Sequence, residues 1–254
     1  MMHRGKVHLV GSGPGDPELL TLKAARLIAG AGVVVFDRLV GESILDLLPA
    51  GARRMDVGKE TGRHAVPQAE INRLLVGLAM DGHDVVRLKG GDPFIFGRGG
   101  EEAQALAAAG IPFEVVPGIT AASGCAAASG IPLTLRGIAE GVRLVTGHRQ
   151  DDGDLDLDWA SLADPRCTLV VYMGVASAER MAAGLVGAGL PADTPVAIIE
   201  RGTTPEQRTW VSRLGCLTAD MERWAPKPPA LLVIGRVVDH AVVSGWPALA
   251  EAAQ

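Results

Sequence analysis

The sequence contains few cysteines. The three that are present, Cys125, Cys167 and Cys216, are widely spaced and odd in number, which argues against a disulfide framework. No two of them form a Cys-x-x-Cys motif, so the sequence predicts no metal site. Cys125 lies among alanines, and we expect it to be a small buried residue.

Long hydrophobic runs and blocks of like charge are also missing. No run approaches the roughly 18 apolar residues of a membrane span, and the N-terminal residues lead into a short strand without a signal-peptide core. The net charge is −5 and the sequence pI is about 5.7. Neither suggests nucleic-acid binding or a membrane-surface helix. We therefore expect a cytoplasmic protein, in which an anionic ligand would need a local group of basic residues.

The composition is that of a folded protein. Hydrophobic residues make up 48% of the 254 residues and charged residues 21%, which is ample for a packed interior. From residue 6 to about residue 130, predicted strands and helices alternate, which is typical of a parallel sheet flanked by helices. The composition changes after residue 133, and a second set of strands and helices follows. The sequence thus predicts two α/β domains, residues 1–135 and 136–254.

A glycine-rich turn follows the first predicted strand. Gly11 to Gly15 resembles the loop of a Rossmann unit, and Asp37 closes the second predicted strand at a suitable distance. Pro14, however, removes an N–H where a Rossmann loop presents amides to its ligand. We therefore predict that a ligand does not lie on this turn in the way it does in a Rossmann protein.

The stretch of residues 85–102 carries the most information. A short apolar strand ends in Gly90-Gly91, which permits positive φ and close approach of a ligand, and Asp92-Pro93 then makes a fixed turn. Ile95-Phe96 supplies apolar surface, and after another glycine-rich segment Glu101-Glu102 opens a helix at its positive end. A glycine turn alone does not explain the whole run, so we interpret it as the edge of a pocket.

Three other segments allow two interpretations each. Lys59, Arg63 and His64 lie close together, either in a solvated crossover or in a functional basic loop. Residues 151–158 are rich in aspartate but lack the ligand spacing of an EF-hand, which favours a solvated loop over a calcium site. An aliphatic helix over residues 181–190 suits either an interface or the core.

These motifs together resemble the uroporphyrinogen-III C-methyltransferase branch of the tetrapyrrole methylase family. The resemblance covers roughly residues 6–240. It is carried by residues 10–17, 34–40, 57–59, 86–102, 115–125 and 142–148. The long central run and the Val-Thr-Gly-His strand are specific to this branch. Some relatives carry this module fused to a dehydrogenase and ferrochelatase domain, and because nothing precedes residue 6 here, we expect that activity to be absent.

The resemblance implies the tetrapyrrole-methylase fold, with S-adenosylmethionine in a cleft between two α/β domains. The implied reaction is two successive methylations of uroporphyrinogen III, through precorrin-1 to precorrin-2, with S-adenosylhomocysteine as the co-product. The product would serve sirohaem or cobalamin biosynthesis. The resemblance further implies a homodimer.

The resemblance also implies site residues. The implied cofactor-binding residues are Pro14, Gly90, Gly91, Asp92, Ile95, Thr120, Ala121, Met173 and Gly202. Asp37 is implied as the proton acceptor and Lys59 as the proton donor. Because the substrate carries carboxylates, basic residues should contact it. Our candidates are Arg38, Arg63, Arg98, His148 and Arg149, together with Lys59, Lys89 and Arg201.

Two other hypotheses stay open at this point. One is a methylase of the same fold that acts on a later corrin precursor or on a protein side chain. The other is a cofactor-binding module without catalysis. The presence of Asp37, Lys59 and the basic residues disfavours the second, because a binding module needs only the glycine turns.

Overall fold

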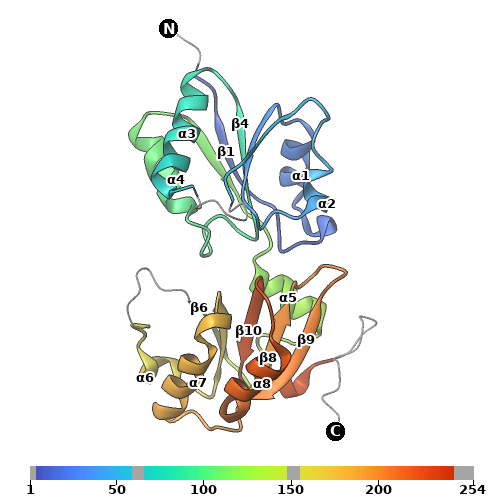
Figure 1. The fold of residues 1–254 in the computed structure, drawn as a ribbon, viewed down its shortest axis with the longest axis vertical. Coiled ribbons are helices and arrows are strands. Elements are labelled where there is room, and N and C mark those ends of the chain that lie inside the picture. Colours follow the sequence, from blue (N-terminus) through green and yellow to red (C-terminus); the bar gives the residue numbers. More distant parts are fainter. Residues whose placement is uncertain (1–3, 59–65, 148–154, 243–254) are drawn as a thin grey trace. The chain divides into compact units, whose positions relative to one another are not determined.

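The computed structural model describes residues 4–58, 66–147 and 155–242 of the chain (Figure 1). The chain divides into two compact units, Met1–Thr120 and Ala121–Gln254. We call them the first and the second unit and describe each by itself. Both are α/β, as the sequence predicts. None of the helices within the described residues has the length and hydrophobicity that a membrane span requires.

The first unit is a parallel five-stranded sheet with the strand order β3-β2-β4-β1-β5 (Figure 1). Strands and helices alternate along the chain, which confirms the predicted pattern. The strands are β1 (Val7–Gly11), β2 (Val33–Phe36), β3 (Arg53–Asp56), β4 (Val85–Lys89) and β5 (Phe113–Val116). The helices are η1 (Pro17–Leu19), α1 (Leu22–Ala29), α2 (Glu42–Leu45), α3 (Gln68–Met80) and α4 (Gly99–Ala108).

Helices cover both faces of this sheet because side chains alternate along each strand. Odd-numbered residues such as Val7, Val33 and Val85 belong to an apolar cluster with residues of α3 and α4. Even-numbered residues such as Val34 and Val86 belong to a second cluster with residues of α1 and α2. The central strand β4 is therefore buried along its whole length.

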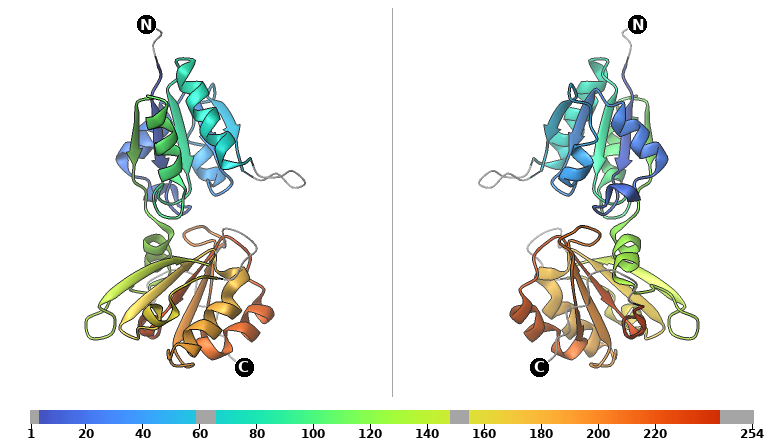
Figure 2. Two further views of the ribbon diagram at one scale, coloured as in Figure 1. Left: turned by 90° about the vertical axis from the view of Figure 1, so that its left-hand side faces the viewer. Right: turned by 90° about the vertical axis from the view of Figure 1, so that its right-hand side faces the viewer.

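The second unit contains a second sheet with helices packed against it (Figure 2). This sheet is mixed, and its five strands follow the order β6-β7-β10-β8-β9. β6 and β7 are parallel, whereas β10 runs antiparallel to both β7 and β8, and β8 pairs antiparallel with β9. The strands are β6 (Gly141–Thr146), β7 (Cys167–Tyr172), β8 (Pro195–Glu200), β9 (Arg208–Arg213) and β10 (Ala230–Ile234). The helices are α5 (Ala121–Ser129), α6 (Trp159–Leu162), η2 (Val175–Ser177), α7 (Ala178–Gly187), η3 (Leu214–Cys216), α8 (Leu217–Trp224) and η4 (Arg236–His240).

The helix α5 belongs to the second unit. Its residues Ala122 and Cys125 lie in one apolar cluster with strand residues such as Val170 and Val233. Small side chains let this helix approach the sheet closely. The two compact units therefore divide at residue 120, ahead of the domain boundary that we predicted after residue 135.

The aliphatic helix for which the sequence allowed two interpretations is part of the core. Met181 and Leu185 of α7 are fully buried, and Leu190 is 6% exposed. All of them pack in the apolar cluster on one face of the second sheet. This face of α7 is therefore not available as an interface. Of the aspartate-rich segment, residues 151–154 lie outside the described residues.

Candidate active site

The residues predicted for the site in the first unit follow the carboxyl ends of its strands. Pro14 follows β1, Asp37 and Arg38 follow β2, and Gly90, Gly91 and Asp92 follow β4. Thr120 comes after β5, and Ile95 lies in the loop between β4 and α4. Because these strands are parallel, their carboxyl ends meet at one edge of the sheet, where open α/β sheets bind ligands.

Main-chain atoms of three of these loops touch one another at this edge. A Cβ on Gly118 would lie 2.2 Å from the Gly91 oxygen and 2.8 Å from the Gly11 carbonyl carbon. A Cβ on Gly11 would lie 2.6 Å from the Gly118 nitrogen. Gly91 itself has φ of 68°, which favours glycine. We call Gly11, Gly91 and Gly118 the glycine junction; it admits no side chain, and the sequence had indicated only Gly91 as a site residue.

The turn from Gly11 to Gly15 is not a Rossmann loop. Ser12 N donates to Lys89 O at 2.8 Å, and Gly13 and Gly91 exchange hydrogen bonds of 3.2 Å and 2.7 Å. The turn thus continues to pair with the exit of β4. The helix α1 begins only at Leu22, where the Thr21 side chain caps it.

Asp92 ties two of the loops together. One carboxylate oxygen accepts from Phe94 N at 2.8 Å, and the other accepts from Gly118 N at 3.1 Å. We expected this carboxylate to accept hydrogen bonds from the cofactor. The structure gives it a second role, because it holds the glycine junction closed.

The loop after Asp92 contains strained residues. Phe96 has φ of 52° and Arg98 has φ of 59°, a left-handed conformation that is uncommon for residues other than glycine. Arg98 is exposed and donates to both oxygens of Glu101 at 2.8 Å. This hydrogen bond raises the pKa of Arg98 and lowers that of Glu101. The guanidinium predicted to meet substrate is thus held in place by its neighbour on α4.

Beneath this edge lies a buried group of charged residues on the face of the sheet that packs against α3 and α4. Glu102 of α4 accepts from Arg87 at 3.0 Å and from Lys89 at 3.1 Å, and all three are almost fully buried. Arg87 also pairs with Asp37 at 3.3 Å. We call Asp37, Arg87, Lys89 and Glu102 the buried ion cluster. Burial chiefly, and then the Arg87 charge, lower the pKa of Lys89, although Glu102 and Asp37 act in the opposite direction.

Sequence reasoning missed the roles of Arg87 and Glu102. Alternation along β4 places Arg87 and Lys89 on the same face as Val85, and charges on a buried parallel strand require partners. That pattern was a signal for a buried ion pair. Its partner, Glu102, had been interpreted only as a residue suited to the start of a helix.

The predicted residues of the second unit lie at the ends of its elements. Met173 follows β7, has φ of 55° and is half-exposed. Tyr172, just before it, accepts through its hydroxyl from Ala122 N, next to Ala121, at 2.9 Å. A Cβ on Gly202 would lie 2.2 Å from the Cys125 Sγ. The structure therefore brings the start of α5 close to the ends of β7 and β8.

Cys125 is a buried residue, as the sequence predicts. Only 4% of it is exposed, and burial raises the pKa of its thiol to about 12. It packs under the backbone of Gly202. Its role is therefore that of a small apolar support and not that of a nucleophile.

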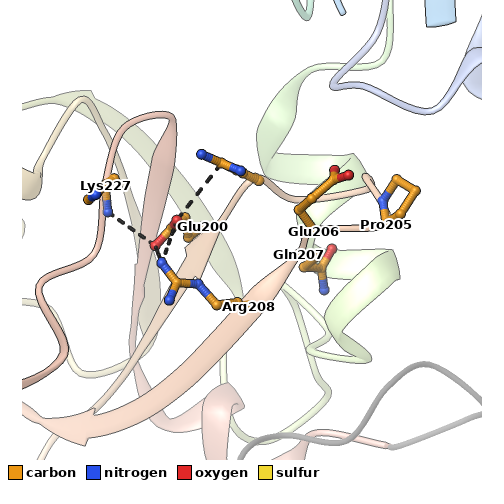
Figure 3. Close-up of a pocket in the computed structure, with 7 residues that line it drawn as sticks. Glu200, Pro205, Glu206, Gln207, Arg208 and Lys227 are labelled. Atoms are coloured by element: carbon orange, nitrogen blue, oxygen red, sulfur yellow. Dashed lines mark hydrogen bonds and ion pairs between the residues drawn. The ribbon is translucent and has the colours of Figure 1, made fainter.

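A hollow of about 390 Å³ opens at the end of β8 (Figure 3). Glu200, which is 1% exposed, lines this hollow and accepts from Arg208 at 2.7 Å and from Lys227 N at 3.1 Å. Arg201 contacts the same carboxylate at 3.9 Å. Burial opposes the charge of Glu200, but the hydrogen bonds from Arg208 and the Lys227 amide keep its pKa below the ordinary value. We call Glu200, Arg201, Arg208 and Lys227 the rim cluster, because its three basic residues are all exposed.

Four predicted residues lie outside the described part of the chain: Lys59, Arg63, His148 and Arg149. Within the described residues, no group of His, Cys, Asp and Glu side chains is arranged to hold a metal ion.

Comparison with known protein families gives a match over most of the chain. A family described as Tetrapyrrole (Corrin/Porphyrin) Methylases matches residues 6–218. The chain is 55% identical over 240 residues to a siroheme synthase of Gluconobacter oxydans (strain 621H), covering 94% of this chain and 51% of that protein. It is 52% identical over 233 residues to a uroporphyrinogen-III C-methyltransferase of Paracoccus denitrificans (strain Pd 1222), covering 92% of this chain and 81% of that protein. The chain thus spans about half the length of the siroheme synthase.

Solved structures are similar over nearly the same length. One is uroporphyrin-III C-methyl transferase from Thermus thermophilus complexed with S-adenyl homocysteine, with a TM-score of 0.80 and 45% identity over 93% of this chain and 100% of that chain. Another is a cobalt precorrin-4 methyltransferase, with a TM-score of 0.81 and 26% identity over 92% of this chain and 96% of that chain.

Proposed function

The chain belongs to the tetrapyrrole (corrin/porphyrin) methylase family, and from this premise we propose that it is a methyltransferase that acts on uroporphyrinogen III. In this proposal it uses S-adenosylmethionine and makes precorrin-2 in two transfers, through precorrin-1. The observation that carries the proposal is the 52% identity to a uroporphyrinogen-III C-methyltransferase along 92% of this chain. The product belongs to the route toward sirohaem or cobalamin.

The residues at the edge of the first sheet fit a cofactor held by main-chain contacts. The glycine junction presents backbone without side chains, and Asp92 fixes it. We propose that the cofactor lies across Gly90, Gly91 and Asp92 and is also contacted by Pro14, Ile95, Thr120, Ala121, Met173 and Gly202. When bound there, S-adenosylmethionine would supply the methyl group for a new C–C bond at a ring carbon, with S-adenosylhomocysteine as the co-product.

The Asp37 carboxylate has the chemistry to accept the proton that each methyl transfer releases. Alkylation leaves a positive charge on the ring system, which is relieved when a C–H or N–H bond breaks and its electron pair returns to the ring. The Asp37 carboxylate, 27% exposed at the carboxyl end of β2, would accept that proton or stabilise the charge before it leaves. Lys59 is proposed as the proton donor. The protein's larger contribution is orientation, worth roughly 7–11 kcal/mol in well-placed reactions.

Basic residues are proposed to hold the substrate carboxylates. Arg38 follows Asp37 directly, and Arg98 is exposed and oriented by Glu101. Arg63, His148 and Arg149 complete the proposed set. A planar guanidinium binds a carboxylate at two points, and this contact is stronger than the screened long-range repulsion from a net charge of −5.

The direct test is incubation of the pure protein with S-adenosylmethionine and uroporphyrinogen III under anaerobic conditions. We expect the absorbance of precorrin-2, or of sirohydrochlorin after oxidation, and two equivalents of S-adenosylhomocysteine per tetrapyrrole. Methylation of a later corrin precursor with no reaction on uroporphyrinogen III would identify a different methylase of the same fold. Cofactor binding without any transfer would indicate a binding module.

The placement of the cofactor is tested at Gly91. Gly91→Val introduces a β-branched side chain at positive φ, and we expect calorimetry to show at least a roughly 100-fold weaker affinity for S-adenosylhomocysteine with the fold retained by circular dichroism. Gly100→Ala is the matched control, because a Cβ there meets no atom within 4 Å. Unchanged affinity in Gly91→Val would contradict the placement.

Substitution of Arg98 distinguishes a substrate-binding role from a cofactor-binding role. Arg98→Lys keeps the charge but loses the planar fork, so we expect a higher substrate KM with S-adenosylhomocysteine affinity unchanged. Asp37→Asn should instead lower kcat with little effect on either affinity. Equal losses of cofactor affinity in both variants would show that these residues do not act on the substrate.

We further propose a homodimer that works in the cytoplasm. The family resemblance supports this, but the aliphatic face of α7 is not its interface, because that face is buried in the second unit. Light scattering at micromolar concentration should give twice the 26.3 kDa chain mass. A monomer mass would refute the dimer.

A further inference from the structure

Arg87 uses its whole guanidinium inside the first unit. Nε donates to Glu102 Oε1 at 3.0 Å, Nη1 donates to the Leu88 carbonyl at 2.9 Å, and Nη2 donates to Asp37 Oδ2 at 3.3 Å. The side chain is 2% exposed. Because each bond comes from a different nitrogen of one rigid plane, the contact with Asp37 has its direction set by the other two.

Asp37 is held at both of its oxygens. Oδ1 accepts from Leu39 N at 3.1 Å, within its own turn, and Oδ2 accepts from Arg87. The side chain nevertheless stays 27% exposed. The carboxylate is thus fixed from below and from within its turn, while part of it faces outward at the edge of the sheet.

Glu102 fixes the far end of the same chain of contacts. Its Oε1 accepts from Arg87, from Lys89 at 3.1 Å and from the Gln68 side chain of α3 at 3.3 Å. The residue is fully buried, and its Oε2 has no hydrogen-bond partner among the described residues. One carboxylate oxygen therefore joins β4, α3 and α4 and prevents the Arg87 guanidinium from rotating.

We propose that Arg87, anchored by Glu102, is the positioning residue for the Asp37 carboxylate. The inference rests on the proposed function, in which Asp37 receives the proton released after methyl transfer. Because the Arg87 side chain is 2% exposed, in this proposal it acts on the reaction only through Asp37. Its effect is to keep Oδ2 of Asp37 turned inward, so that the outward part of the carboxylate meets the ring in one orientation.

The test is a double-mutant cycle on Arg87 and Asp37. Arg87→Lys keeps a charge on β4 but cannot reach Glu102 and Asp37 together. We expect Arg87→Lys to lower kcat roughly 10- to 100-fold, with substrate KM and S-adenosylhomocysteine affinity within about twofold of wild type. The double variant with Asp37→Asn should turn over no more slowly than Asp37→Asn alone, because the positioned group is already gone.

Arg73→Lys is the matched control, since Arg73 makes an exposed ion pair with Glu70 in the same unit, at 3.8 Å. It should keep wild-type kcat. A folded Arg87→Lys enzyme with wild-type kcat, or a double variant whose loss equals the product of both single losses, would overturn the inference. If Arg87→Lys does not fold, Asp37→Glu takes its place: it moves the carboxylate by one methylene, and unchanged kcat would show that the fixed placement is not needed.

A second arm separates this inference from the proposed function. Thermal unfolding of the same variants reports on the contact between Arg87 and Asp37 without any substrate. The decrease in Tm of the double variant should be smaller than the sum of the two single decreases. Additive decreases in Tm would show that Arg87 and Asp37 do not interact. Coupled Tm losses in a protein that does not methylate uroporphyrinogen III would instead reject the proposed function.

Discussion

Each unit places a buried glutamate near the carboxyl end of a strand, but the surroundings differ. In the first unit the cations that contact Glu102 are buried with it, whereas in the second unit the cations that contact Glu200 are exposed. Burying a cation is costly unless it is paired, so the buried ion cluster exists only as a complete set. If the rim cluster loses a member, water can solvate the exposed basic residues that remain. The geometry of the buried ion cluster in the first unit is therefore fixed, whereas the rim cluster in the second unit tolerates substitution.

Gly118 of the first unit and Gly202 of the second differ in a similar way. In the first unit a Cβ on Gly118 would meet backbone atoms of Gly91 and Gly11. In the second unit a Cβ on Gly202 would meet the side chain of Cys125. Backbone held by a parallel sheet cannot move aside, but a side chain can be replaced by a smaller one.

The largest expected effect comes from Glu102→Gln. Removing this charge leaves Arg87 and Lys89 buried without a carboxylate between them, and we expect a loss of about 3–5 kcal/mol in the free energy of unfolding by urea denaturation. Glu101→Gln, one position earlier and half-exposed, should change it by less than about 0.5 kcal/mol. Similar losses in the two variants would remove the distinction between buried and exposed clusters.

Gly118→Ala should be the next most damaging change. The added Cβ would overlap the Gly91 carbonyl, and we expect a loss of about 1–3 kcal/mol of unfolding free energy together with loss of S-adenosylhomocysteine binding. Replacing a neighbouring side chain should not restore either property, because the clash is with backbone. Wild-type binding in a folded Gly118→Ala protein would show that the junction adapts.

Gly202→Ala should cost about 1–2 kcal/mol and, unlike Gly118→Ala, should respond to a second change. Cys125→Ala removes the Sγ that the new Cβ would meet at 2.2 Å. Urea denaturation of the two single variants and the double variant measures the coupling. The contrast between the units fails if Cys125→Ala restores no stability to Gly202→Ala.

Glu114 tests whether the number of partners or their burial decides the effect. Lys23, Lys6 and His8 all contact this carboxylate at the surface of the first unit, and the hydrogen bond from Lys23 contributes most to lowering its pKa to about 2. Because the folded pKa is depressed, the stabilisation is present above the unfolded pKa of 4.5 and is lost as the pH falls from there toward about 2.

We expect this stabilisation to be about 1–2 kcal/mol, since solvent screens the pairs. The measurement is the difference in unfolding free energy between wild type and Glu114→Gln from pH 7 to pH 2.5. It should be largest at neutral pH and shrink in acid. A difference as large as that for Glu102→Gln would mean that the number of partners outweighs burial.

Glu200→Gln should have the smallest effect, about 1 kcal/mol. Arg208 would keep its stacking over the Trp210 ring, 4.9 Å from the centroid, and water would solvate the guanidinium. Urea denaturation again gives the value. A loss of 3 kcal/mol or more would show that the rim cluster is as strongly coupled as the buried one.

Local sequence patterns predicted much of the fold. Apolar periodicity predicted the alternating strands and helices of the first unit and the α/β class of the second, but not the helices α6 and α8. Pro14 indicated correctly that the first glycine turn is not a Rossmann loop. The run after β4 was interpreted as a pocket edge from its glycines, and it lies at the edge of the sheet where four other loops end. These features depend on residues close in sequence, so short-range rules are enough to find them.

Contacts between distant residues could not be predicted in the same way. The division of the chain at residue 120 follows from the packing of α5 on the second sheet, and the burial of α7 follows from packing on its other face. The pairing of Arg87 with Glu102 and Asp37 depends on the order of the strands, which places β2 beside β4, and on α4 returning over that face.

By itself, the sequence determined the α/β class, the glycine turns and the family, because each is written in composition or in motifs of adjacent residues. Only the tertiary structure decided that Gly11, Gly91 and Gly118 touch and that Arg87 reaches Asp37. The physical reason is the parallel sheet: it brings the ends of β1, β2, β4 and β5 to one edge, and burial there excludes water. Charged side chains that water would solvate separately in the unfolded chain must then pair with one another.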